Sequence, residues 1–271
     1  MPFPETPRAI YERNPLTEVI CQLRFPTILR IASERPAEFQ DRLRDRYPVY
    51  RENRGAAPGM PAEISQLLAD LPIQIPTEPS YAFEAEDGKR TVNLSREFVA
   101  VTERDYRDWE SFRGEVERIK AAVEEIYAPP FYDRTGLRYQ DVIDREALDL
   151  QGVPWHELVR PPMAGLLGGD DDGVRERIRE AVATAELEIP EITGGTVRLQ
   201  YGLGIHEGHP EKIYGMDADF YTTERSSTDG VLEILNAFNK HAGNFFRWSI
   251  TDRLRDALRP RDDAAEDVDG G

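Results

Sequence analysis

Residues 81–94 read YAFEAEDGKRTVNL, with an alternating segment on each side of Asp87-Gly88. Alternation of apolar and polar residues is typical of strands that bury one face. Asp-Gly between two such segments favours a β-hairpin, and we expect a type I′ turn because its two central residues need positive φ. The sequence therefore predicts two antiparallel strands joined by a tight turn.

Further strands are expected on both sides of this hairpin. Residues 16–25 (LTEVICQLRF) alternate in the same way, so one side of this segment should be buried. The residues expected to face the core are Val19, Cys21, Leu23 and Phe25. Other strands are expected over residues 97–102, 132–143, 196–205 and 212–223. Within residues 132–143, the side chains expected to point inward are Leu137, Tyr139 and Val142.

Helices are predicted where apolar residues recur three and four positions apart. The clearest case runs from Trp109 to Ile126, where Asp108 is suited to the N-cap and Pro129-Pro130 ends the helix. Other helices are expected over residues 33–47 and 174–187, from an Asp229 cap onward, and in a short segment that begins at Ser249 or Thr251 and ends near Leu258.

This order of elements predicts an α+β protein with largely antiparallel sheets and packed helices. The first half is expected to be ferredoxin-like, with a split βαβ arrangement, and the second half to form a smaller α/β layer. We expect a first domain over residues 1–150, a second subdomain over 151–259 packed on it, and a disordered acidic tail over 260–271. Both halves place strands before a long helix, which indicates a faint internal duplication.

Composition restricts the partners of the chain. Its 271 residues include 34 Lys and Arg against 51 Asp and Glu, for a formal net charge of -17. Because cations that neutralise phosphates dominate nucleic-acid affinity, this excess argues against non-specific nucleic-acid binding and against anionic membranes. The single cysteine, Cys21, is expected to be a buried structural thiol. With no leader-like or membrane-spanning segment evident, we expect a cytoplasmic protein.

Three arginines are candidates for a binding site. Arg134 and Arg138 have the same strand parity, so they share one face of the sheet unless Gly136 forms a bulge. Together with Arg24 on the first strand, they could hold an anion or an acidic partner. The alternative is that they pair with nearby carboxylates.

A second set of residues has the chemistry of a divalent metal site. The set consists of His206, His209, Asp217 and Asp219, with His241 as a further candidate. The alternative is a polar hairpin loop with solvated histidines and carboxylates on an exposed strand face. We find no lysine-bearing glycine-rich phosphate loop and no nucleophile motif, and we expect no cofactor. His241 lies toward the end of a helix, where we expect it to serve packing.

Three stretches together resemble a sporadically distributed family of uncharacterised prokaryotic proteins of about this length. The stretches are residues 14–19 (NPLTEV), 134–139 (RTGLRY) and 235–252 (LNAFNKHAGNFFRWSITD). The resemblance would cover nearly the whole chain and implies no catalytic residues. A sporadic distribution is typical of mobile or defence-associated genes.

The leading hypothesis is a non-enzymatic interaction or regulatory protein that works with a protein partner or as a homo-oligomer. Such a protein could be a component of a prokaryotic defence or toxin–antitoxin-like assembly. One alternative is a metal-dependent hydrolase or nuclease that uses Asp217, Asp219 and the histidines. Another is a sensor of a small anionic ligand or nucleotide that uses the three arginines.

Overall fold

The computed structural model describes residues 2–53, 79–169, 172–204 and 212–261. Its strands are β1 (Ile10–Tyr11), β2 (Leu16–Arg24), β3 (Val49–Asn53), β4 (Ser80–Glu84), β5 (Arg90–Leu94), β6 (Phe98–Glu103), β7 (Arg134–Ile143), β8 (Ala181–Ile189), β9 (Gly195–Gly204), β10 (Ile213–Thr222) and β11 (Pro260–Arg261). Its helices are α1 (Leu29–Ser33), α2 (Ala37–Leu43), α4 (Trp109–Tyr127), α5 (Pro161–Ala164), α6 (Asp172–Arg175), α7 (Val231–Ser249) and α8 (Asp252–Ala257), with 3₁₀ turns η1 (Trp155–Glu157) and η2 (Gly165–Gly168). The α+β class is confirmed.

In the described ranges, one antiparallel sheet of nine strands forms the centre of the fold, in the order β3-β4-β5-β6-β2-β7-β10-β9-β8. The middle pair, β2 and β7, comes from opposite ends of the first 143 residues. β10 then pairs along nearly the whole of β7. The same sheet therefore continues through residues 1–150 and 151–259. The ferredoxin-like split βαβ arrangement is not confirmed, because β2 is antiparallel to both of its neighbours.

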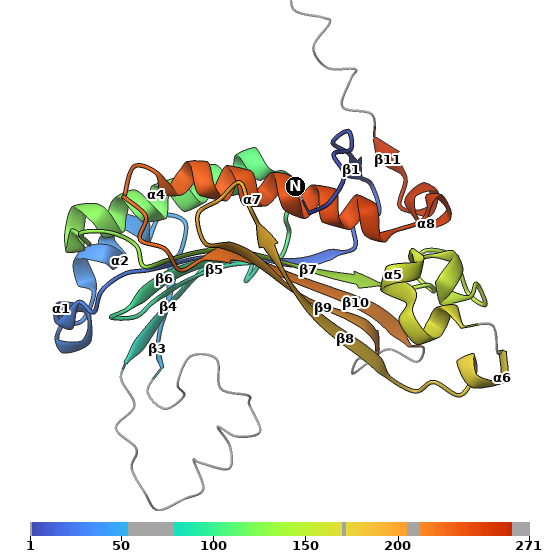
Figure 1. Ribbon diagram of the computed structural model, residues 1–271. Coiled ribbons are helices and arrows are strands. Elements are labelled where there is room, and N and C mark those ends of the chain that lie inside the picture. The colour runs from blue at the N-terminus through green and yellow to red at the C-terminus, as the bar shows by residue number, and fades with distance from the viewer. Residues whose placement is uncertain (1, 54–78, 170–171, 205–211, 262–271) are drawn as a thin grey trace, which may run out of the picture.

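The long helices α4 and α7 lie on one face of this curved sheet (Figure 1). The core lies between them and the sheet, because alternate strand residues are apolar and point toward the helices. Examples of these inward residues on the central strands are Val19, Cys21, Leu23, Leu137, Ala218 and Phe220, all nearly inaccessible. The opposite face of the central strands carries mainly polar and charged side chains, and we call it the open face.

The chain consists of two similar halves. The first half runs β2, α1 and α2, β3 to β6, then α4; the second runs β7, α5 and α6, β8 to β10, then α7. From the central pair outward, the strands are ordered β2-β6-β5-β4-β3 on one side and β7-β10-β9-β8 on the other. α4 and α7 each contain 19 residues. The topology of the described elements therefore agrees with the internal duplication indicated by the sequence, with one additional described strand in the first half.

Capping explains where the helices begin. The Asp108 carboxylate accepts a hydrogen bond from the Ser111 amide at the start of α4, and the Thr251 hydroxyl accepts one from the Leu254 amide at the start of α8. Both caps agree with the sequence. Asp229 does not cap α7, because that helix begins after Gly230 without a side-chain cap.

A buried carboxylate also connects α4 to the segment that follows α2. Glu115 is 3% exposed. Its carboxylate accepts hydrogen bonds from the Tyr47 hydroxyl at 2.8 Å, from Arg118 Nη2 at 2.8 Å and from Arg46 Nη1 at 2.9 Å. Although burial opposes its ionisation, the hydrogen bonds from Arg118 and Tyr47 lower the pKa of Glu115. This network fixes α2 against α4.

Two expected elements differ in the structure. The helix expected over residues 174–187 is wrong, because the second half of that stretch forms β8, which pairs with β9 from Ala181 to Ile189. Alanine, glutamate and leucine favour helix locally, but an available strand edge outweighs that preference. The helix expected over residues 33–47 is interrupted, since α1 ends at Ser33 and α2 begins after Pro36.

Finer details of the strands also differ. Val142 was expected to point inward, but it lies half-buried on the open face, and its neighbours Asp141 and Ile143 are the buried residues. The hairpin between β4 and β5 is confirmed, but its turn is not type I′ because within it only Gly88 has positive φ, at 69°. At the other end of the chain, Pro260 and Arg261 pair with β1.

Candidate ligand-binding site

The arginines expected to bind an anion lie on the open face and are largely paired. Arg138 donates a bidentate pair of hydrogen bonds to Asp217, with Nε to Oδ1 at 2.7 Å. Arg134 donates to Asp219 at 2.8 Å and to Gln22 at 2.9 Å. Both arginines share a face without a bulge at Gly136. Arg24 is exposed and lies opposite Arg134 in the strand register. The three arginines are thus brought together, but two of them are neutralised.

The same ion pairs engage two of the expected metal ligands. Asp217 and Asp219 lie together on the open face, where each carboxylate binds an arginine of β7. His206 and His209 lie outside the described residues. In the described ranges, no group of three or more His, Cys, Asp or Glu is arranged to hold a metal ion. The metal site therefore stays a prediction, for which Arg134 and Arg138 would have to release the two carboxylates.

A cavity of about 670 Å³ lies on the other side of the sheet, next to α7 and the start of α4. Its floor is formed by Leu16, Tyr139, Asp141 and Ala218 from β2, β7 and β10. One wall comes from residues 239–247 of α7, and the opposite wall comes from residues 106–109. The last side is closed by residues 5–11, which we call the strap. Four sides, built from segments spread over the whole sequence, therefore surround one space.

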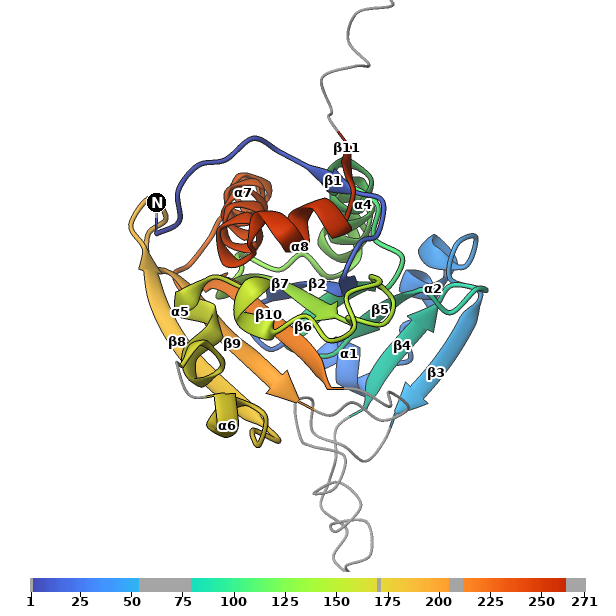
Figure 2. The same cartoon turned by 90° about the vertical axis from the view of Figure 1, so that its right-hand side faces the viewer.

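The strap crosses α7 and ends in β1, which lies beside β11 (Figure 2). Thr6 fastens it to α7, because its amide donates to Asn244 Oδ1 at 3.3 Å and its carbonyl accepts from Arg247 Nη2 at 3.2 Å. Arg8 forms a bidentate pair with Glu110 on α4, at 2.7 and 2.8 Å. The strap is therefore attached to both long helices over the cavity.

Asp141 is the least expected residue on the cavity floor. It belongs to the inward-facing register of β7 and is only 8% exposed. No hydrogen bond or ion pair joins its carboxyl group to another residue in the part of the chain that the structure describes. Burial, together with the negative charge of Asp217, raises the pKa of Asp141 to about 7. This carboxyl group can therefore exist in both protonation states near neutral pH.

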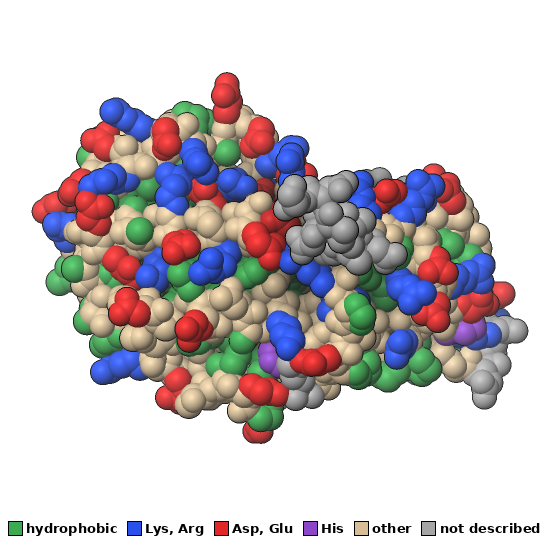
Figure 3. Space-filling model, turned by 90° about the horizontal axis from the view of Figure 1, so that it is seen from above, with side chains coloured by type: hydrophobic (Ala, Val, Ile, Leu, Met, Phe, Trp, Pro, Cys, Tyr) green, Lys and Arg blue, Asp and Glu red, His purple; other side chains and the backbone are tan. Residues whose placement is uncertain are grey.

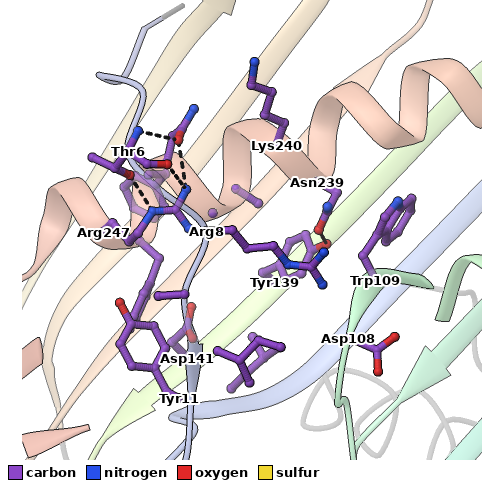
Figure 4. Close-up of a pocket in the computed structure, with 18 of the residues that line it drawn as sticks. Thr6, Arg8, Tyr11, Asp108, Trp109, Tyr139, Asp141, Asn239, Lys240 and Arg247 are labelled. Atoms are coloured by element: carbon purple, nitrogen blue, oxygen red, sulfur yellow. Dashed lines mark hydrogen bonds between the residues drawn. The ribbon is translucent and has the colours of Figure 1, made fainter. Parts of the chain in front are cut away.

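Two further polar groups of the cavity lack a full set of partners. The Tyr11 hydroxyl is buried and has no hydrogen-bond partner in the described structure. Among the described residues, Arg247 binds only neutral acceptors, namely Thr6 and the Asn244 side chain. Burial lowers the pKa of Arg247, and the nearby positive charge of Arg8 lowers it further. Figure 4 shows Tyr11 and Asp141 near each other on the sheet side of the cavity.

Aromatic side chains form much of the remaining lining. The Tyr106 and Tyr139 rings meet edge to face, with centroids 6.0 Å apart. The Tyr139 hydroxyl donates to Asn239 Oδ1 at 2.8 Å, and Trp109 Nε1 donates to Asn236 Oδ1 at 2.8 Å. These bonds to α7 hold the rings in place. The cavity thus combines apolar walls with few, specifically placed polar groups, as ligand pockets generally do.

Sequence reasoning missed this site, although one signal was present. In β7, Leu137, Tyr139, Asp141 and Ile143 have one parity, so an aspartate occupies a position that alternation assigns to the core. A carboxyl group in such a register is costly unless it is paired or functional. The roles of Tyr11 and Arg247 have no comparable signal, because their contacts join opposite ends of the chain.

Two other residues considered from the sequence lie away from this cavity's lining. Cys21 is buried, and burial raises its pKa to about 12, which agrees with a structural thiol. His241 is buried within α7, and burial lowers its pKa. Its Nε2 lies 3.8 Å from Glu191, and its Nδ1 has no hydrogen-bond partner among the described residues.

Basic and acidic side chains are interspersed over the helix-covered face (Figure 3). Many of them pair, as Lys240 does with Glu5 at 2.5 Å. None of the described helices combines the length and apolar content needed to cross a lipid bilayer. In the comparisons with known proteins, no family model matches the chain and no curated protein matches it in sequence. The resemblance to an uncharacterised prokaryotic family therefore stays a prediction.

Proposed function

We propose that this protein is a non-enzymatic regulatory protein that binds a small polar molecule in the cavity beneath the strap. The observation that carries the proposal is the buried Asp141 carboxyl group, which faces a cavity of about 670 Å³ without a partner in the described chain. This volume lies within the roughly 300–1,000 Å³ of typical ligand pockets. A ligand would compensate a desolvated group that the protein leaves unsatisfied.

This proposal relocates the sensor function considered from the sequence. Two of the three arginines that suggested an anion site, Arg134 and Arg138, are engaged with Asp219 and Asp217, so an anion would have to displace a carboxylate from each of these two. The cavity needs no such exchange at Asp141. We also retain a protein partner in the proposal, because a sensor without chemistry acts through another molecule.

Regulation is favoured over catalysis because the other carboxylates that line the cavity are engaged with protein groups. Glu5 pairs with Lys240, and Asp108 caps α4. Asp141 therefore has no second carboxyl group beside it that is free to act as its acid or base counterpart among the described lining residues. Enzymes that use two carboxyl groups keep both available to the substrate.

The experiment is equilibrium dialysis of the purified protein against a metabolite extract, with mass spectrometry of the retained compounds. Ala218→Leu narrows the cavity from its floor, whereas Ala183→Leu makes the same change on the exposed edge strand β8. We expect wild type and Ala183→Leu to retain a compound that Ala218→Leu does not. A ligand at 100 times its Kd should also raise stability by about 2.7 kcal/mol. Equal retention by all three proteins would contradict the proposal.

A second function is favoured by the titration of Asp141 itself. A carboxyl group whose pKa is about 7 is suited to act as a general base near neutral pH. In that case the retained compound would be converted during dialysis, and Asp141→Asn would stop the conversion while leaving the compound bound. Recovery of the compound unchanged from the wild-type protein would exclude this second function for it.

A further inference from the structure

We infer that the ligand of this cavity is a small zwitterion, which places its ammonium group on Asp141 and its anionic group on Arg247. This inference rests on the proposed function, because it assigns the ligand class of the same cavity. It follows from which charged groups of the lining are already engaged with protein atoms, and from the free donors of one guanidinium group.

Most charged groups of the lining are engaged with protein atoms. Glu5 and Lys240 neutralise each other, and Arg8 is held by Glu110. Asp108 caps α4. Arg107 lines the rim that the cavity shares with a neighbouring depression containing Asp105. Asp141 is buried and Arg247 is half-buried, and the two carry opposite charges. Neither of them has a countercharge in the described structure.

Arg247 has hydrogen-bonding capacity left for an anion. Its Nε donates to the Thr6 hydroxyl, and its Nη2 donates to the Thr6 carbonyl and to Asn244. Both hydrogens of Nη1 lack an acceptor among the described residues. A Cβ atom at Gly243 would lie 2.9 Å from Nη1, so glycine at this position allows the guanidinium group to lie close against α7. The two free N–H groups of Nη1 can each donate to a carboxylate oxygen.

Asp141 and Tyr11 offer the opposite chemistry. A carboxylate accepts hydrogen bonds only, and the oxygen of the unpartnered Tyr11 hydroxyl can accept one more. An ammonium group supplies three donors and one positive charge. The Tyr106, Trp109 and Tyr139 rings line the same space, and aromatic rings favour a nearby organic cation. This side of the cavity therefore fits an ammonium group.

Asp141 and Arg247 do not form an ion pair with each other, although both line one cavity. A ligand with a single charge would compensate one of them and leave the other buried. A zwitterion compensates both and adds no net charge to the site. Complementary charges of this kind favour one ligand class over others, mainly by penalising the wrong one.

The test is isothermal titration calorimetry with unbranched ω-amino acids from glycine to 6-aminohexanoate, compared with butylamine and pentanoate. We expect one chain length to bind at least about tenfold more tightly than either singly charged probe. Asp141→Asn and Arg247→Met should each weaken that binding at least about tenfold. Asp229→Asn, an exposed aspartate that caps no helix, serves as the control and should leave it unchanged.

A measurement on the wild-type protein guards against variants that fail to fold. An ammonium group favours the ionised form of Asp141, whose other titratable neighbours are Tyr11 on the strap, Tyr139 on β7 and Asp217 on the opposite face. Binding should therefore release a proton near pH 6.5, so that the heat depends on the ionisation enthalpy of the buffer. Affinity should rise with pH between 6 and 7, by up to about tenfold.

The outcomes separate this inference from the function on which it rests. If dialysis yields a ligand that Ala218→Leu does not retain, but no ω-amino acid binds and the ligand lacks one of the two charges, the zwitterion assignment is wrong and the sensor function stands. If no compound is retained in the cavity and no amino acid binds, both the zwitterion assignment and the sensor function are wrong. Binding that is equal for the ω-amino acid, butylamine and pentanoate would also overturn the assignment.

Discussion

Asp141→Asn should stabilise the ligand-free protein at alkaline pH. Burial raises the pKa of this carboxyl group from the ordinary 3.8 to about 7, so the folded protein disfavours the ionised form. At 1.36 kcal/mol for each tenfold change in proton affinity, this difference corresponds to about 4 kcal/mol above pH 7. Since the buried amide of asparagine also lacks partners, we expect the free energy of unfolding at pH 8 to rise by about 2–3 kcal/mol.

The pH dependence distinguishes this effect from a change in packing. A carboxyl group with a raised pKa binds its proton more tightly when the protein is folded. The ionised group therefore reduces wild-type stability progressively as pH rises from about 4 to about 7, and fully above pH 7. The stability difference between Asp141→Asn and wild type should grow over the same range and vanish or reverse below pH 4. Titrating groups that do not interact with Asp141 cancel in this difference.

The assay is urea unfolding followed by tryptophan fluorescence at pH 5, 6, 7 and 8, with Asp229→Asn as the matched control. The control should follow the wild type at every pH, because Asp229 is exposed and caps no helix. An Asp141→Asn variant that is less stable than wild type at pH 8 would refute the reasoning. A stabilisation that does not change between pH 5 and 8 would refute it as well.

Three further predictions concern the scaffold. Glu115→Ala should lower the free energy of unfolding by about 2–4 kcal/mol in urea titrations, because it leaves the partly buried Arg118 guanidinium group and the buried Tyr47 hydroxyl without their carboxylate. Cys21 is 1% exposed, so a thiol reagent should modify it at the rate of unfolding and not at the rate for a free thiol. Gly202 has φ 151°, and a Cβ there would lie 1.9 Å from the Ala181 carbonyl oxygen, so Gly202→Ala should lower the melting temperature and loosen β8 in hydrogen exchange.

Alternation and capping were sufficient to predict much of the scaffold. In β2 the alternation of Val19, Cys21 and Leu23 with polar residues reports directly which side is buried. α4 could be placed because Asp108 marks its start and its apolar residues repeat with helical spacing. β8 could not be predicted in this way. Its residues favour helix locally, and only the neighbouring strand β9 makes the extended form more stable.

More of the open face than of the cavity could be predicted from the sequence. Pairing of Arg134 and Arg138 with aspartates was foreseen as an alternative, because strand parity alone places them on one face. The cavity depends on contacts such as Thr6 with Asn244, which are 238 positions apart. Local patterns carry no information about such contacts. The aspartate in the inward register of β7 was the one local indication of a site.

The repeated architecture also affects the orientation in which a ligand can bind in the cavity. If the two halves were identical, a space between α4 and α7 would present every group twice, and a bound molecule could enter in either orientation. Here α4 contributes the Trp109 indole and α7 contributes the Arg247 guanidinium, while the strap has no counterpart in the second half. Because the two halves have diverged, the two ends of the cavity differ chemically. The cavity can therefore bind a molecule with unlike ends in a single orientation.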